Sequence, residues 1–121
     1  MKIFWLMFAL LALEANAAPV PSILVVGDSL SAGYGIELRA GWVTLLQQRL
    51  TRQGYPHTVV NASISGDTTG GGRARLPDAL KRHRPQIVLI ELGGNDGLRG
   101  LSLRETRANL EAMINTAQAA G

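Results

Sequence analysis

Short apolar runs alternate along the chain with longer amphipathic stretches. The runs at 22–26, 58–62 and 86–92 are rich in isoleucine and valine, and each is bounded by polar or turn-forming residues. Runs of this length and composition predict short buried strands. The third run, "QIVLIEL", is apolar on both faces until Glu91 and is the strongest strand pattern.

The stretches between these runs predict helices. Apolar residues at helical spacing indicate a helix at 41–53. Pro77 is expected to begin a short helix that ends at residue 83, with a backward extension kinked at the proline as the alternative. The capping box formed by Ser102 and Glu105 predicts a final helix. The apolar faces expected for the first and last of these helices comprise Trp42, Leu45, Leu46 and Leu50, and Leu103, Leu110, Met113, Ile114 and Ala117.

The resulting order, β-α-β-α-β-α, predicts an α/β fold with a parallel sheet and helices on both faces. In such sheets, ligands bind outside the carboxyl ends of the strands. The loops expected at these ends are 27–29, 61–66 and 93–96, and each carries polar or glycine residues. We therefore expect the three loops to converge on one site.

The residue types in these loops suit acyl transfer. Ser29 is a candidate nucleophile at the first turn after its strand, and its own N–H is a candidate oxyanion donor. Gly66 can bring a second main-chain N–H close, because glycine has no side chain to block the approach. Asn95 offers a side-chain N–H as a third donor. Asp28 and Asp96 are expected either to cap helices or to brace these loops.

Each candidate also has a plain structural interpretation. Ser29 is equally suited to capping a helix, Gly66 to forming a turn, and Asn95 to bonding its own backbone in a turn. The glycine-rich loop expected at 63–72, with arginines behind it, leaves a phosphate-binding module open as a competing function. Against that function, neither Gly-x-x-x-x-Gly-Lys-[Ser/Thr] nor Gly-x-Gly-x-x-Gly after a strand occurs in the chain.

Composition narrows these alternatives. The chain has 121 residues, a formal net charge of +3 and no cysteine, which excludes disulfides, thiolate catalysis and cysteine–zinc sites. Its two histidines are far apart and form no metal-ligand spacing. The densest basic group, expected on a solvated helix face, has no interleaved aromatics, so nucleic-acid binding is not expected. It comprises Arg73, Arg75, Lys81, Arg82 and Arg84.

The first 17 residues have the features of a secretory signal peptide. Lys2 gives a positive start, the apolar run 3–13 is too short to span a membrane, and Ala15-Asn16-Ala17 has the small-x-small form of a cleavage site. We therefore expect cleavage after Ala17, a mature domain at 18–121, no stable membrane span, and a periplasmic or secreted location.

Taken together, three motifs resemble a known family. "GDSL" at 27–30, "NASISGDTT" at 61–69 and "ELGGNDGLRG" at 91–100 are similar to the first three blocks of the GDSL, or SGNH, hydrolases. The resemblance runs from about residue 22 to the end of the chain. It implies a three-layer α/β/α fold of the flavodoxin-like kind, in the form found in SGNH hydrolases. It also implies Ser29 as nucleophile and Ser29, Gly66 and Asn95 as the oxyanion hole. It also implies that Leu98 lines the acyl site.

The same resemblance implies substrates that are acyl esters and thioesters, including aryl esters and lysophospholipids, with no metal or nucleotide cofactor. The fourth block of the family, Asp-x-x-His, is absent, and the segment around neither His57 nor His83 matches it. We therefore expect an N-terminal portion of such an enzyme, with little or no activity by itself. A non-catalytic acyl- or carbohydrate-binding domain is the alternative. Acyl-chain length and oligomeric state are left open.

Overall fold

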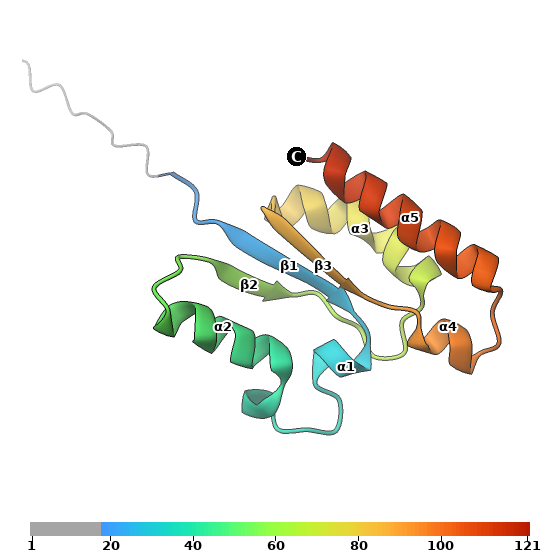
Figure 1. Cartoon of the computed structure of the whole chain (residues 1–121), viewed down its shortest axis with the longest axis horizontal. Helices are drawn as coiled ribbons and strands as arrows, with labels where there is room; N and C mark the ends of the chain where they lie inside the picture. Colours follow the sequence, from blue (N-terminus) through green and yellow to red (C-terminus); the bar gives the residue numbers. More distant parts are fainter. Residues whose placement is uncertain (1–17) are drawn as a thin grey trace, which may run out of the picture.

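The computed structural model describes residues 18–121 and shows a sheet of three strands with helices around it (Figure 1). The predicted signal peptide lies outside these residues. The predicted order of three strands and three longer helices is confirmed, with further short helices in the loops. The elements are β1 (Ser22–Gly27), α1 (Ser29–Ala32), a 3-10 helix η1 (Leu38–Ala40), α2 (Trp42–Arg52), β2 (Thr58–Asn61), α3 (Thr69–His83), β3 (Ile87–Glu91), α4 (Gly94–Leu98) and α5 (Leu103–Ala119).

The sheet is parallel throughout, with the strand order β2-β1-β3. Ser22 pairs with Thr58 on one side of β1, and Ile23 pairs with Ile87 on the other. β1 is therefore the central strand, and its residues from Ile23 onward are buried. Within the described chain β3 is an edge strand, because β1 is its only neighbour in the sheet.

Helices cover both faces of the sheet. Leu24 and Val26 pack with Leu76 and Leu80 of α3 and with Met113 of α5, so α3 and α5 share one face and lie side by side (Figure 1). Because side chains alternate along a strand, Ile23 and Val25 point to the opposite face, and they are buried as well. α1 packs against β1 and α2 against β2, and the right-handed crossover from β1 to β2 places α2 on that face. This arrangement confirms the three-layer prediction.

The prediction that Pro77 begins a helix is wrong, because α3 begins at Thr69 and contains Pro77 in its interior. The Thr68 hydroxyl caps α3 by accepting a hydrogen bond from the Gly71 N–H at 3.2 Å. The glycines expected in a loop belong instead to the first turn of this helix. A Cβ at Gly72 would lie 2.3 Å from Leu92 Cδ1 and 3.0 Å from Met113 Cε, so Gly72 lets α3 approach β3 and α5 closely.

The predicted apolar faces are only partly correct. In α2 the buried residue is Val43, whereas Trp42 and Leu45 keep 37% and 48% of their surface exposed. In α5 Met113 is buried, but Leu103 at the helix start is 83% exposed. Helical spacing therefore identified the helices but not which of their residues are buried. The predicted turn at 93–96 contains the start of a short helix, α4.

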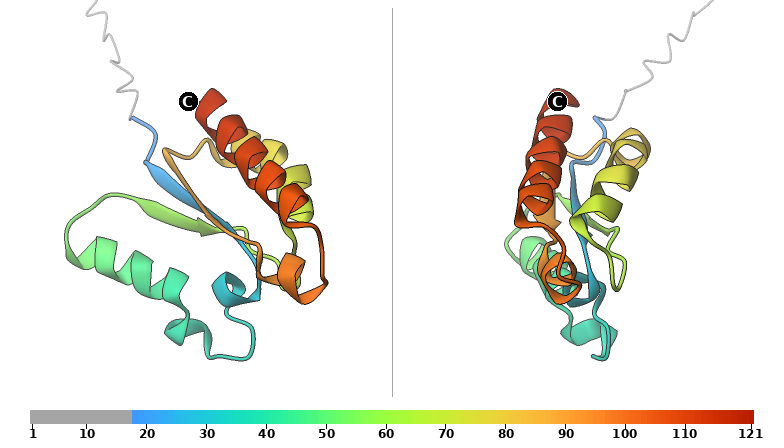
Figure 2. Two further views of the ribbon diagram at one scale, coloured as in Figure 1. Left: turned by 45° about the vertical axis from the view of Figure 1, so that its right-hand side comes forward. Right: turned by 90° about the vertical axis from the view of Figure 1, so that its right-hand side faces the viewer.

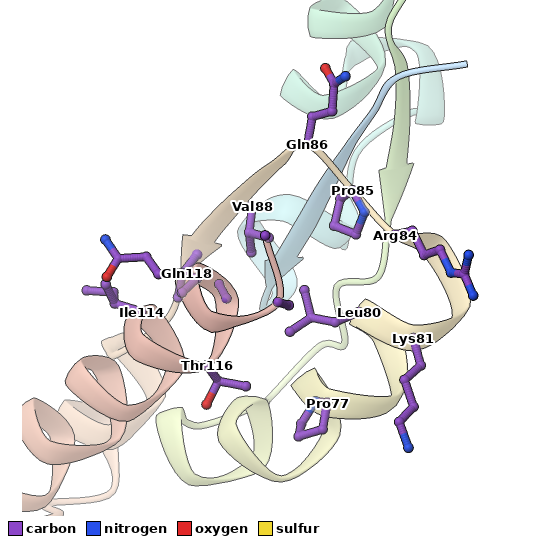
Figure 3. Close-up of a pocket in the computed structure, with 14 residues that line it drawn as sticks. Pro77, Leu80, Lys81, Arg84, Pro85, Gln86, Val88, Ile114, Thr116 and Gln118 are labelled. Carbon is purple, nitrogen blue, oxygen red and sulfur yellow. The ribbon is translucent and has the colours of Figure 1, made fainter. Parts of the chain in front are cut away.

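A hollow of about 760 Å³ lies where the C-terminal halves of α3 and α5 meet β3 (Figure 3). Leu80, Val88 and Ala117 are among its apolar lining residues, and Lys81 and Arg84 are the cations among the residues that line it. The hollow contains none of the candidate residues from the strand-end loops. The hollow runs along the side of β3 that has no neighbouring strand among the described residues. It therefore results from the position of β3 at the edge of the sheet.

Candidate functional site

Ser29 occupies the first position of α1, directly after the buried central strand. Asp28 is the N-cap of this helix, and its Oδ1 accepts a hydrogen bond from the Leu30 N–H at 2.9 Å. The capping interpretation of Ser29 is therefore wrong. Among residues 18–121 the Ser29 hydroxyl has no hydrogen-bond partner, and the side chain is half-buried at the carboxyl end of β1. A hydroxyl in this position is accessible for attack on a substrate.

Gly66 lies in a tight turn after β2. The Asp67 N–H donates to the Ile64 carbonyl at 3.1 Å, and Gly66, at the third position of the turn, has a φ of 82°. A turn with positive φ at this position favours glycine. The turn interpretation is therefore correct. It is compatible with a donor role, because the Gly66 N–H donates no hydrogen bond within the described part of the chain.

Asn95 links the other two loops. Its Nδ2 donates to the Asp67 carbonyl at 2.9 Å and to Asp28 Oδ2 at 3.3 Å. Asp67 follows Gly66 and Asp28 precedes Ser29, so one carboxamide contacts the immediate neighbours of both residues. The predicted convergence of three strand ends is thus observed, and α1 and α4 lie at the same end of the sheet (Figure 2). The interpretation of Asn95 as a turn-former bonded to its own backbone is wrong.

Asp96 is buried and braces the base of the third loop. Its Oδ1 accepts from the Thr69 N–H at 2.8 Å, and its Oδ2 accepts from the hydroxyls of Thr69 at 2.5 Å and Thr106 at 2.9 Å. Burial by itself would raise the pKa of Asp96, but the hydrogen bonds from Thr69 and Thr106 outweigh it and hold the pKa below its ordinary value of 3.8. Asp96 is therefore a charged anchor between α3, α4 and α5.

Arg75 was assigned by the sequence to a solvated helix face, and that assignment is wrong for this residue. Its guanidinium donates to Asp67 Oδ2 at 2.8 Å, to the Gly27 carbonyl at 3.3 Å and to the Ala62 carbonyl. These acceptors belong to the ends of β1 and β2 and to the loop that carries Gly66. The Arg75 guanidinium thus links the loop after β1 to the loop after β2. The periodicity of the helix gave no signal for this role.

Sequence reasoning also missed the buried Ser31 and the carboxylate of Glu91, whose Oε1 accepts from the Ser31 hydroxyl at 2.6 Å. A signal for Glu91 existed, because it is the first charge in an otherwise apolar strand pattern. Leu98, by contrast, is 87% exposed at the end of α4, and its predicted place in an acyl site stays a prediction.

Neither histidine lies near Ser29. Thr58, which follows His57, pairs with Ser22 at the start of β1, and Ser22 Oγ donates to the His83 carbonyl at 3.4 Å. Both histidines are therefore at the amino edge of the sheet. A strand of six residues places Ser29 about 20 Å away, at the opposite edge. No group of three metal-ligating side chains occurs among residues 18–121.

Comparison with protein families gives a match that covers all three strand-end loops. Residues 25–121 match the GDSL-like lipase/acylhydrolase family. The chain belongs to this family. The GDSL-type architecture accounts for the loops found here, because the match includes all three strand ends with Ser29, Gly66 and Asn95.

Over the aligned residues, relatives within the GDSL-like family are about half identical to this chain. "Esterase TesA" of Pseudomonas aeruginosa is 52% identical over 111 residues, which are 92% of this chain and 55% of that protein. "Thioesterase 1/protease 1/lysophospholipase L1" of Escherichia coli K12 is 47% identical over 92% of this chain and 52% of that protein. The chain therefore spans about half the length of these relatives.

The fold is shared with solved GDSL-type structures. The psychrotrophic esterase EstA from a Pseudoalteromonas species, in a structure inhibited by monoethylphosphonate, superposes with a TM-score of 0.78 at 46% identity. The superposition covers 82% of this chain and 54% of that one. The parallel sheet and its covering helices are therefore those of SGNH hydrolases. Among residues 18–121, no helix has both the length and the apolar character needed to cross a membrane.

Proposed function

We propose that this protein contributes the nucleophile and the oxyanion hole of a serine hydrolase that cleaves acyl esters and thioesters. The contact of the Asn95 carboxamide with the neighbours of both Ser29 and Gly66 is the observation that carries the proposal. It holds a hydroxyl, a main-chain amide and a side-chain amide at one edge of the sheet. These are the nucleophile and the oxyanion donors that acyl transfer requires.

Each residue has a distinct role in this reaction. The Ser29 oxygen attacks the acyl carbon, and the N–H groups of Ser29 and Gly66 donate to the oxyanion that forms. The Asp67 carbonyl holds one N–H of Asn95 at 2.9 Å, while the other faces Asp28 at 3.3 Å. The longer, weaker bond is the one that we expect a substrate oxygen to replace. Leu98 is the proposed contact with the acyl chain.

The proton of Ser29 must go to a base from outside the described site. His57 and His83 lie at the opposite edge of the sheet, and they are the only histidines of the chain. We propose that the 121-residue chain has little or no turnover by itself, and that the Asp-x-x-His block of the GDSL pattern completes the site. An oxyanion hole without its base retains only a small part of the catalysis.

The names of the relatives support the proposed substrate class. The relatives are named as an esterase, and as a thioesterase, protease and lysophospholipase. Oxyesters and thioesters share an acyl carbon and a developing oxyanion, so one hole of neutral donors serves both. We further propose that residues 1–17 direct export and are removed after Ala17. N-terminal sequencing of the exported protein tests this, and an intact Met1 terminus would contradict it.

The decisive experiment joins this chain to the part of the Pseudomonas esterase that it does not span, placed after Gly121. We expect this hybrid to hydrolyse p-nitrophenyl butyrate and to react with a fluorophosphonate. Both activities should disappear in Ser29→Ala and persist in Ser65→Ala, a matched change of an exposed serine in the second loop. The 121-residue chain alone should show neither activity.

The outcomes separate the alternatives. A folded hybrid whose turnover does not depend on Ser29 would contradict the assignment of the nucleophile. A folded hybrid that binds acyl ligands without turnover would favour a non-catalytic binding domain. Serine-dependent turnover by the 121-residue chain alone would show that its base lies within this sequence.

A further inference from the structure

The helix that carries Ser29 is too short to hold its own position. α1 has four residues, and an isolated helix of that length is unstable. Leu30 is 72% exposed, so it contributes little packing, and Ser29 itself is only half-buried. Ser31 is the buried residue of α1. Besides the cap formed by Asp28, the placement of Ser29 therefore depends on what the Ser31 side chain contacts.

The Ser31 hydroxyl is the centre of a chain of hydrogen bonds across three elements. It donates to Glu91 Oε1 at 2.6 Å and accepts from the Trp42 indole N–H at 3.2 Å. Glu91 ends β3 and Trp42 begins α2. The same Glu91 oxygen faces the N–H of Asp28, the N-cap of α1, at 3.5 Å. A short hydroxyl–carboxylate bond of this kind is about twice as strong as a neutral one.

The backbone beneath this network leaves no room for it to shift. A Cβ at Gly27 would lie 2.6 Å from the Ser31 Oγ and 2.9 Å from Glu91 Oε1. On its other side, the Ser31 carbonyl accepts a hydrogen bond from Asn61 Nδ2 at 2.8 Å. The hydroxyl is thus confined between β1 and β3, and α1 follows the position of the Glu91 carboxylate.

We propose that Glu91 is a positioning residue for Ser29. Its carboxylate fixes the buried Ser31 hydroxyl, and through it the orientation of α1, so that the Ser29 oxygen and N–H face the same point. Glu91 does not touch the substrate and transfers no proton. The functional part of this inference rests on the proposed role of Ser29, whereas the structural part does not.

The structural part is tested in the 121-residue chain, with Trp5 changed to phenylalanine so that Trp42 is the only tryptophan. Glu91→Ala and Ser31→Ala should shift the Trp42 indole N–H resonance and the Ser29 amide resonance in ¹⁵N NMR spectra. Glu91→Gln keeps an acceptor oxygen and should shift both resonances less. Glu111→Gln, which removes a charge from the exposed Arg107–Glu111 pair, should shift neither. An unchanged Ser29 resonance in folded Glu91→Ala would overturn the proposal.

The functional part is tested in the catalytically complete hybrid. We expect Glu91→Ala to lower kcat about 10- to 100-fold with a KM within about twofold, because misplacement by an ångström affects the transition state most. Ser31→Ala should lower kcat similarly, and the double variant should lose little more, since both act through one contact. Full kcat in folded Glu91→Ala would contradict the role. If Ser29→Ala remains active, the proposed function fails, while the NMR result still stands.

Discussion

The Asn95 carboxamide donates to the Asp67 carbonyl at 2.9 Å and thereby joins the loop after β3 to the loop after β2. The two residues are 28 positions apart in the sequence. This bond fixes one N–H of Asn95 and leaves the other facing the carboxylate of Asp28, the residue before Ser29. The pairing thus places a donor from the loop after the edge strand beside the end of the central strand.

Replacing Asn95 by alanine should remove both this link and the third oxyanion donor. In the catalytically complete hybrid we expect kcat to fall about 10²- to 10³-fold, as for the loss of one oxyanion-hole donor. Hydrolysis of p-nitrophenyl butyrate measures this change. Asn115→Ala, on the exposed side of α5, is the matched control and should have full activity. Full activity of Asn95→Ala would exclude Asn95 from the oxyanion hole.

Gly27→Ala should destabilise the chain, because the new methyl group would lie 2.6 Å from the Ser31 Oγ in a fully packed region. Overpacking of this kind costs about 1–3 kcal/mol in the free energy of unfolding. Urea denaturation followed by circular dichroism measures it. Gly97→Ala has nothing within 4 Å of its Cβ inside α4 and should be neutral or slightly stabilising. Equal stabilities of the two variants would contradict the packing argument.

Arg75→Met should destabilise far more than Arg73→Met, although the two residues belong to the same helix. Arg75 pairs with Asp67, and both side chains are largely buried, so its removal leaves a carboxylate without its partner. We expect a loss of about 2–4 kcal/mol in the free energy of unfolding, toward the lower range for a broken buried pair. Arg73 makes one exposed hydrogen bond to Asn109, and its variant should lose less than 1 kcal/mol. Similar losses would restore the solvated-face interpretation of Arg75.

Asp96 should make the chain sensitive to acid. Its folded pKa lies below 3.8 because hydrogen bonds from Thr69 and Thr106 outweigh its burial. Its contribution to stability is therefore fully present above that pH and is lost as the pH falls through the folded pKa. At neutral pH, Asp96→Asn should cost about 1.5–3 kcal/mol in the free energy of unfolding.

Thermal unfolding at neutral pH and below pH 3.8 measures the acid sensitivity, and the gap between Asp96→Asn and the parent chain should narrow in acid. Asp78→Asn, at an exposed position of α3, is the control. A difference in stability between the two proteins that stays constant across the pH range would show that the charge of Asp96 does not contribute to stability.

The two edges of the sheet should differ in their tendency to associate. Gln47 protects β2, because its side chain accepts from the Val59 N–H at 2.7 Å and donates to the His57 carbonyl at 3.1 Å. Ile87 on the edge strand β3 is 45% exposed instead. Because unprotected edges template pairing with other chains, we expect Ile87→Lys to reduce concentration-dependent association and Gln47→Ala to increase it. Sedimentation velocity measures both, and the reverse order would contradict the proposal.

Much of the fold was predictable because it depends on local pattern. The apolar run before Gly27 predicted β1, and the capping box at Ser102 correctly located the start of α5, where the Ser102 hydroxyl accepts from the Glu105 N–H. The position of each candidate residue relative to a strand end also followed from the sequence. These features could be read because the periods of helices and strands are set by the backbone itself.

The sequence by itself thus determined the order of the elements and placed Ser29, Gly66 and Asn95 at the ends of three parallel strands. Only the tertiary structure decided that the Asn95 amide bonds Asp28 and Asp67, that Arg75 is turned inward, and that Glu91 holds Ser31. Such contacts join residues far apart in the chain, and they depend on how helices cross the sheet. The periodicity of a single helix or strand does not specify which residues of another element it will contact. These pairings therefore form only when the core packs.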